Sequence, residues 1–111
     1  MTCFWDSLRN GLQLNISNNE FINNLKDKNT ANNTNILWNN ISLTKKQLEE
    51  NYIHVKDFDI KTINNGYYCS VCDPFIILIC DIYNINIHHN YNGYLMKYTH
   101  INKYNTILYF N

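Results

Sequence analysis

The sequence predicts an α+β fold in which helices come first and a small antiparallel sheet comes last. Apolar residues recur at helical spacing through most of the chain, and after residue 84 the pattern changes to an alternation of apolar and polar residues. Helices and strands that occupy separate parts of a chain are typical of the α+β class. A length of 111 residues is enough for one modest hydrophobic core, so we expect one domain over residues 1–111.

Two short amphipathic helices are predicted near the start of the chain. Phe4, Leu8 and Leu12 follow one another at intervals of four, which places them on one stripe of a helix over residues 3–12. A second helix is expected over residues 19–28, where the apolar side chains share one face and the polar ones face water.

A capping box marks the start of the third predicted helix, after a segment at 29–40 that is expected to be a connection. Thr44 is a good N-cap residue, and Gln47 three positions later can bond back to the backbone of Thr44. The helix is expected over residues 45–52. Residues 53–66 are expected to be irregular or short extended structure that ends in a turn.

The fourth predicted helix is apolar on nearly every side and is therefore expected at the centre of the fold. Asp73 is placed to cap it and Pro74 suits its first position, from which the helix runs to Tyr83.

Three strands are expected after this helix. Ile85, Ile87 and His89 alternate with Asn86 and His88, which is the pattern of a half-buried strand. The pair Asn92-Gly93 favours a hairpin turn into a second strand over residues 94–99, and a third strand is expected over residues 106–110.

Composition argues against several classes of partner. Nine basic and nine acidic residues give no net charge, and no run of like charge is present, so we expect no nucleic-acid partner. The longest apolar run, 74–80, is too short to span a bilayer, and no signal peptide precedes it, so no membrane partner is expected either. The 22 asparagines match the codon usage of an AT-rich genome.

Cysteine and histidine are the residues that could carry chemistry. We expect the four cysteines to be reduced thiols in a cytosol-like compartment. Cys3 is at the start of the first predicted helix, where unpaired N–H groups and the helix dipole stabilise a thiolate. A thiol protease also needs an imidazole to take the proton. Cys3 is thus either a nucleophile or a small apolar residue of the core. The available imidazoles are His54, His88, His89 and His100.

Cys69 and Cys72 allow two further interpretations. With Cys80 and His88 they could form a zinc site, since zinc binds thiolates and imidazoles. Alone they could be a redox pair, although the strand and helix that flank such a pair in thioredoxins are missing. We favour thiols beside the cap of the central helix, because Cys80 lies inside an apolar helix.

Tyrosines around the predicted hairpin could form a protein-binding surface, or they could simply be strand residues. They are Tyr91, Tyr94, Tyr98 and Tyr104.

Several segments resemble small OTU-like cysteine proteases of large DNA viruses of the mimivirus type. They are Met-Thr-Cys-Phe-Trp-Asp-Ser-Leu at 1–8, Leu-Thr-Lys-Lys-Gln-Leu-Glu-Glu-Asn at 43–51, Gly-Tyr-Tyr-Cys-Ser-Val-Cys-Asp-Pro-Phe at 66–75 and Ile-His-His at 87–89. The resemblance implies an OTU/papain-like core and a deubiquitinase that hydrolyses isopeptide bonds, with Cys3 as the nucleophile and no metal or organic cofactor. It implies a partner that is ubiquitin, a ubiquitin-like protein or another viral protein, in the host cytoplasm or the virion.

The sequence departs from the pattern of this family at both ends. The family places Asp-Gly before the cysteine and the catalytic histidine after the last strand, whereas Met1 and Thr2 precede Cys3, and no histidine occupies the expected place near Phe110. Three explanations remain open. The histidine lies beyond Asn111, or the chain is a non-catalytic virion or host-interaction protein that keeps the fold, or another histidine serves.

Overall fold

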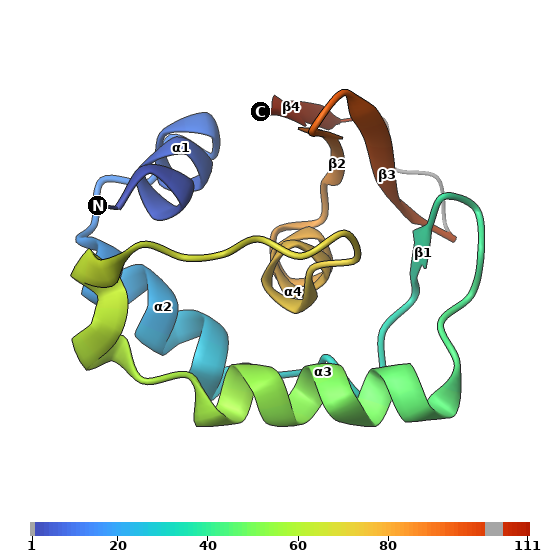
Figure 1. The fold of residues 1–111 in the computed structure, drawn as a ribbon, viewed down its shortest axis with the longest axis horizontal. Helices are drawn as coiled ribbons and strands as arrows, with labels where there is room; N and C mark the ends of the chain where they lie inside the picture. Colours follow the sequence, from blue (N-terminus) through green and yellow to red (C-terminus); the bar gives the residue numbers. More distant parts are fainter. Residues whose placement is uncertain (1, 102–105) are drawn as a thin grey trace.

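Helices pack beside a mixed four-stranded sheet in the computed structural model, which describes residues 2–101 and 106–111 (Figure 1). The α+β class is therefore confirmed. In chain order the elements are α1 (Cys3–Gly11), α2 (Asn18–Asp27), β1 (Ile36–Trp38), α3 (Lys45–Asp57), the 3-10 helix η1 (Ile60–Asn65), α4 (Pro74–Tyr83), β2 (Asn86–Tyr91), β3 (Tyr94–His100) and β4 (Ile107–Phe110).

The predicted helix caps are confirmed at α3 and α4. Thr44 Oγ1 accepts a hydrogen bond from the Gln47 N–H at 3.2 Å, and Gln47 Oε1 accepts from the Thr44 N–H at 2.8 Å. Asp73 caps α4, with Pro74 in its first turn. The prediction of irregular structure over 53–66 is wrong in part, because α3 continues to Asp57 and η1 follows. Val55 is fully buried, and its burial stabilises this last turn of α3.

The sheet is mixed, so the prediction of an antiparallel sheet is wrong in part. Its strand order is β1-β3-β2-β4, and β4 runs parallel to β2. The β2–β3 hairpin is antiparallel as predicted, and Asn92 and Gly93 form its turn with φ of 51° and 86°. The segment 29–40, predicted to be a connection, contains β1. Strand β1 occupies the outer edge of β3, so this edge is not available to the last strand. Strand β4 pairs with the open edge of β2.

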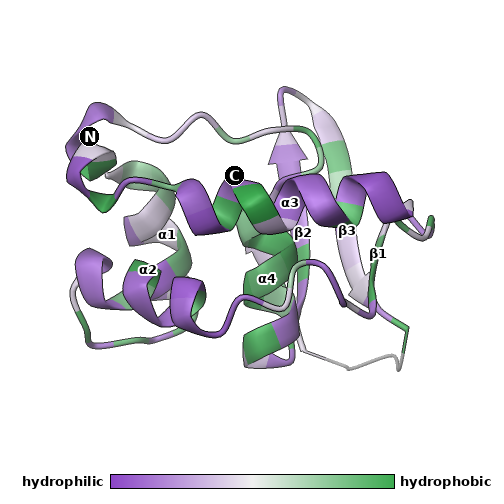
Figure 2. Cartoon of the chain, turned by 90° about the horizontal axis from the view of Figure 1, so that it is seen from below, coloured by the Kyte–Doolittle hydropathy of each residue, from purple (hydrophilic) through white to green (hydrophobic). Residues whose placement is uncertain are grey.

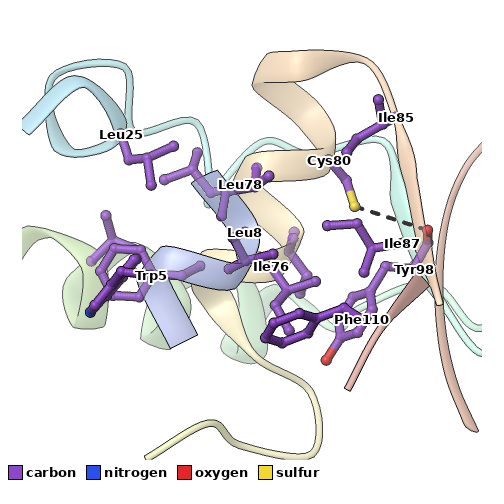
Figure 3. Packing of buried hydrophobic residues seen from close by; sticks show 14 of the residues in the cluster. Trp5, Leu8, Leu25, Ile76, Leu78, Cys80, Ile85, Ile87, Tyr98 and Phe110 are labelled. Atoms are coloured by element: carbon purple, nitrogen blue, oxygen red, sulfur yellow. Dashed lines mark hydrogen bonds between the residues drawn. The ribbon is translucent and has the colours of Figure 1, made fainter. Parts of the chain in front are cut away.

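Helix α4 lies at the centre of the core, as its apolar sequence predicts. Figure 2 shows α4 as an almost continuously hydrophobic helix, whereas α3 is largely hydrophilic. Every residue from Pro74 to Cys80 is buried. Around α4 lie Trp5 and Leu8 of α1 and Ile87 and Tyr98 of the sheet (Figure 3). Each fully buried large apolar side chain contributes about 1.5–3 kcal/mol to folding, so this cluster holds α1, α4 and the sheet together.

Within the described ranges, no helix has both the length and the apolar character needed to cross a membrane.

Candidate functional site

Cys3 is exposed in the first turn of α1, as the nucleophile prediction requires. The Thr2 side chain does not cap this helix, because its hydroxyl donates to Asp6 Oδ2 at 2.7 Å. Asn18 and Arg9 also donate to Asp6, and these hydrogen bonds, chiefly that from Asn18, lower the pKa of the Asp6 carboxyl. The first three N–H groups of an α-helix have no acceptor inside the helix, and at the start of α1 the Thr2 side chain accepts a hydrogen bond from none of them.

Aromatic rings hold the start of α1 against the rest of the molecule. The Phe4 ring lies 4.5 Å from the Tyr67 ring and 5.5 Å from the Phe110 ring, measured between centroids. Trp5 is fully buried, and its ring meets that of Phe75 at 5.0 Å in an edge-on contact. Such aromatic contacts are worth about 0.5–1.5 kcal/mol each beyond the area they bury. They place Cys3 beside the end of β4 and the loop before α4.

His89 faces the same region from the sheet. It lies in β2, where it pairs with Phe110 of β4, and its ring packs at a tilt against the Phe110 ring, with 4.8 Å between the centroids. Only 4% of His89 is exposed. Burial lowers the pKa of His89, and the negative charge of Asp73 partly opposes this shift. The imidazole is consequently neutral at pH 7 and able to accept a proton.

Cys3 and His89 line one pocket of about 180 Å³. The pocket is formed by the start of α1, the loop before α4 and the ends of β2 and β4; its lining residues are Cys3, Phe4, Ser7, Cys69, His89, Phe110 and Asn111. The thiol in direct contact with the imidazole is that of Cys69, whose Sγ lies 3.9 Å from His89 Nδ1. Among the residues that the structure describes, Cys3 Sγ forms no hydrogen bond to an imidazole.

The buried carboxylate of Asp73 fixes the loop that carries Cys69. Its Oδ2 accepts the Tyr67 hydroxyl at 2.9 Å and the Ser70 N–H at 3.0 Å, while Oδ1 accepts the Phe75 N–H at 2.9 Å. The Asp73 N–H donates to the Tyr98 hydroxyl at 2.9 Å. One side chain therefore caps α4 and also anchors both the loop and the Tyr67 ring that holds α1.

Cys69 and Cys72 are half-buried thiols in the loop that leads to the cap of α4. All four cysteines are free, as predicted. Burial, with a contribution from the Asp73 charge, raises the pKa of Cys69 far above its ordinary range and that of Cys72 to about 11. Cys80 is buried inside α4, and His88 packs against Tyr109 at 5.4 Å. Within residues 2–101 and 106–111, no three His, Cys, Asp or Glu side chains gather as a metal site would need.

The other three imidazoles lie outside the pocket. His100 Nε2 is 2.7 Å from the Cys80 carbonyl oxygen inside the core, and His54 Nε2 is 3.2 Å from the Tyr67 hydroxyl. No histidine was singled out from the sequence, so His89 was not predicted to lie in the pocket with Cys3. Strand parity is the signal that identifies it, because His89 follows Ile85 and Ile87 at intervals of two and so shares their buried face.

The tyrosines near the hairpin do not form one surface. Tyr98 is fully buried, and its hydroxyl donates to the Val71 carbonyl at 3.0 Å, so it is a core residue. Tyr91 is half-buried, with its ring 5.7 Å from that of His89. Tyr94 is 70% exposed at the turn. Tyr104 lies outside the described residues.

The pocket brings together the exposed Cys3 thiol and the neutral His89 imidazole, and Cys3 lies in the first turn of α1. A thiol can attack a carbonyl carbon, an imidazole can take and return the proton, and N–H groups can bind the resulting oxyanion. These groups suit acyl transfer. No protein-family model matches the chain, and no curated protein and no solved structure is significantly similar to it.

Proposed function

We propose that this chain is a cysteine-dependent hydrolase with an OTU-like active site, in which Cys3 is the nucleophile and His89 the general base. The observation that supports the proposal is that Cys3 and His89, 86 positions apart in the sequence, line one small pocket. Of the three explanations for the unusual histidine pattern, we therefore choose the one in which another histidine serves.

The proposed mechanism uses two side chains that line the pocket, Cys3 and His89, together with backbone N–H groups of α1. His89 takes the proton of the Cys3 thiol, and the sulfur attacks the carbonyl carbon of the bond to be cut. The N–H groups at the start of α1 stabilise the oxyanion. His89 then gives the proton to the leaving amine, and water hydrolyses the thioester. The low pKa that burial gives His89 keeps its ring neutral at pH 7, as a general base must be.

The substrate class rests on the resemblance of residues 1–8 and 66–75 to OTU-like proteases. It is an isopeptide bond between the C-terminal glycine of ubiquitin, or of a ubiquitin-like protein, and a lysine. The small pocket is consistent with a substrate chain that ends in glycine, because glycine has no side chain to accommodate. The setting that follows from the resemblance is a viral protein acting in the host cytoplasm or carried in the virion.

A ubiquitin with an electrophilic C-terminal propargylamide tests the proposal. The folded protein should form a covalent adduct one ubiquitin heavier, and Cys3→Ala should abolish it. His89→Ala should slow labelling about 100-fold or more, the usual contribution of a general base. His88→Ala is the matched control: this neighbour lies on the opposite face of β2, and its loss should leave the rate unchanged. Equal losses in the two histidine variants would contradict the role given to His89.

A binding role is the second candidate, and the outer face of the sheet favours it. Strand alternation places Leu95, Ile107 and Tyr109 on the face of His88, where they are 51%, 40% and 74% exposed. Exposed apolar side chains on a sheet are typical of surfaces that contact another protein. A protein that is folded by circular dichroism but is not labelled by the ubiquitin probe would favour this non-catalytic role, as a virion or host-interaction protein.

A further inference from the structure

We propose that Cys69 is a positioning residue that holds the His89 hydrogen on Nδ1 and leaves Nε2 as the proton-accepting nitrogen. Cys69 lies in the loop before α4, outside the helix that carries the nucleophile. Its catalytic consequence rests on the proposed function. The tautomer itself does not depend on any activity and can be observed directly.

The direction of the hydrogen bonds follows from two contacts of one sulfur atom. Cys69 Sγ is 3.5 Å from the carbonyl oxygen of Ser70 and 3.9 Å from His89 Nδ1. A carbonyl oxygen can only accept, so the hydrogen in the first contact belongs to the thiol. The Asp73 carboxylate also accepts a hydrogen bond from the Cys69 side chain, so we place the one thiol hydrogen toward these oxygen acceptors, and the sulfur then takes part in the second contact as an acceptor. His89 Nδ1 must then be the donor, and the lone pair of a neutral ring lies on Nε2.

Both groups are neutral, as this arrangement requires. Burial raises the pKa of the Cys69 thiol, and the nearby Asp73 carboxylate further disfavours a thiolate. Burial also lowers the pKa of His89. A neutral thiol keeps the hydrogen it donates to Ser70, and a neutral imidazole has one N–H to give and one nitrogen to accept with.

The surroundings hold both partners in place. The Ser70 N–H donates to Asp73 Oδ2 at 3.0 Å, and the Ser70 hydroxyl lies 3.3 Å from the same oxygen, so the loop around Cys69 is anchored to the cap of α4. On the other side, the His89 ring packs at a tilt against the Phe110 ring, with 4.8 Å between the centroids. The thiol and the ring are held by different elements. The position of the thiol is therefore fixed independently of the ring, and the contact can orient the imidazole.

Nitrogen NMR of the imidazole rings tests the tautomer without a substrate. Long-range ¹H–¹⁵N correlation spectra at pH 8 should show His89 with its hydrogen on Nδ1. Cys69→Ala should move it toward the Nε2–H form, which a free histidine side chain favours. Cys69→Ser should restore the Nδ1–H form, because a hydroxyl can donate to Ser70 and accept from Nδ1 in the same way. Cys72→Ala, a change at the other half-buried cysteine of this loop, is the matched control and should leave the His89 signals unchanged.

Two results would overturn the assignment: a wild-type His89 with its hydrogen on Nε2, or a folded Cys69→Ala protein with the wild-type tautomer. The wild-type spectrum decides the first point even where the alanine variant does not fold. In the ubiquitin-probe assay, Cys69→Ala should slow labelling about 10-fold and Cys69→Ser should recover most of it, since tautomer control is a known contribution of orienting groups. An Nδ1–H tautomer in a protein that never reacts with the probe would refute the hydrolase and leave the tautomer assignment standing.

Discussion

The four thiols of this chain differ in solvent exposure, and burial raises the pKa of Cys69, Cys72 and Cys80. Cys3 is exposed at the start of α1, Cys69 and Cys72 are half-buried, and Cys80 is buried in α4. A thiolate is the reactive form of cysteine, so burial suppresses reaction twice, by blocking access and by raising the pKa. The raised pKa of Cys72, about 11 against an ordinary 9.0, lowers its thiolate fraction at pH 8 about 100-fold.

Alkylation of the native protein with iodoacetamide at pH 8 should therefore modify Cys3 first. Mass spectrometry of peptides over a time course should show Cys69 and Cys72 reacting at least 10-fold more slowly than Cys3, in line with their raised pKa values. Cys80 should react only after urea is added. A reaction of Cys72 as fast as that of Cys3 in the native protein would contradict the burial of the loop before α4.

At the level of secondary-structure elements, the N-caps of α3 and α4 differ in what they support. Thr44 caps α3 on the surface, whereas Asp73 caps α4 in the core and also accepts hydrogen bonds from Tyr67 and Ser70. Loss of an exposed cap removes one or two hydrogen bonds that water can replace. Loss of a buried cap leaves donors without a partner, which costs about 1–3 kcal/mol for each such group.

Asp73→Ala should thus lower the free energy of unfolding by about 2–4 kcal/mol, and Thr44→Ala by about 1 kcal/mol. Urea titration followed by circular dichroism measures both values. The difference belongs to the buried contacts of Asp73, since both variants remove a helix N-cap. Equal losses would show that Asp73 acts only as a cap and does not anchor the loop that carries Cys69.

Local signals in the sequence predicted most of the helices, and the structure shows why they failed elsewhere. The capping box at Thr44 and the Asp73-Pro74 pair are properties of neighbouring residues, so they locate helix starts without knowledge of the fold. Strand β1 escaped prediction because its three residues form a strand only through pairing with β3, 60 or more positions later. The strand β4 was predicted, but its parallel pairing was not, because the edge that it joins depends on where β1 lies.

The candidate site was predictable only in part, because it joins the two ends of the chain. The exposed start of α1 followed from the spacing of Phe4 and its apolar neighbours, and Cys3 was identified from that. His89 and Cys69 needed the fold: the pocket exists only where α1 meets the loop before α4 and the ends of β2 and β4. On the scale of the whole molecule, Phe110 connects α1 with the sheet, because its ring contacts both Phe4 of α1 and His89 of β2.

Phe110→Ala should therefore affect stability and the site together. Phe110 is 7% exposed, so its removal should lower the free energy of unfolding by about 3–5 kcal/mol and speed hydrogen exchange in α1. Tyr109→Ala is the matched control, because this neighbouring ring of β4 is 74% exposed, and its loss should cost less than about 1 kcal/mol. Urea titration gives the two energies, and hydrogen exchange followed by mass spectrometry locates the loosened segment. If α1 exchanges as slowly in Phe110→Ala as in Tyr109→Ala, then Phe110 does not hold α1 beside His89, and Phe4 must be held by Tyr67 and Trp5 alone.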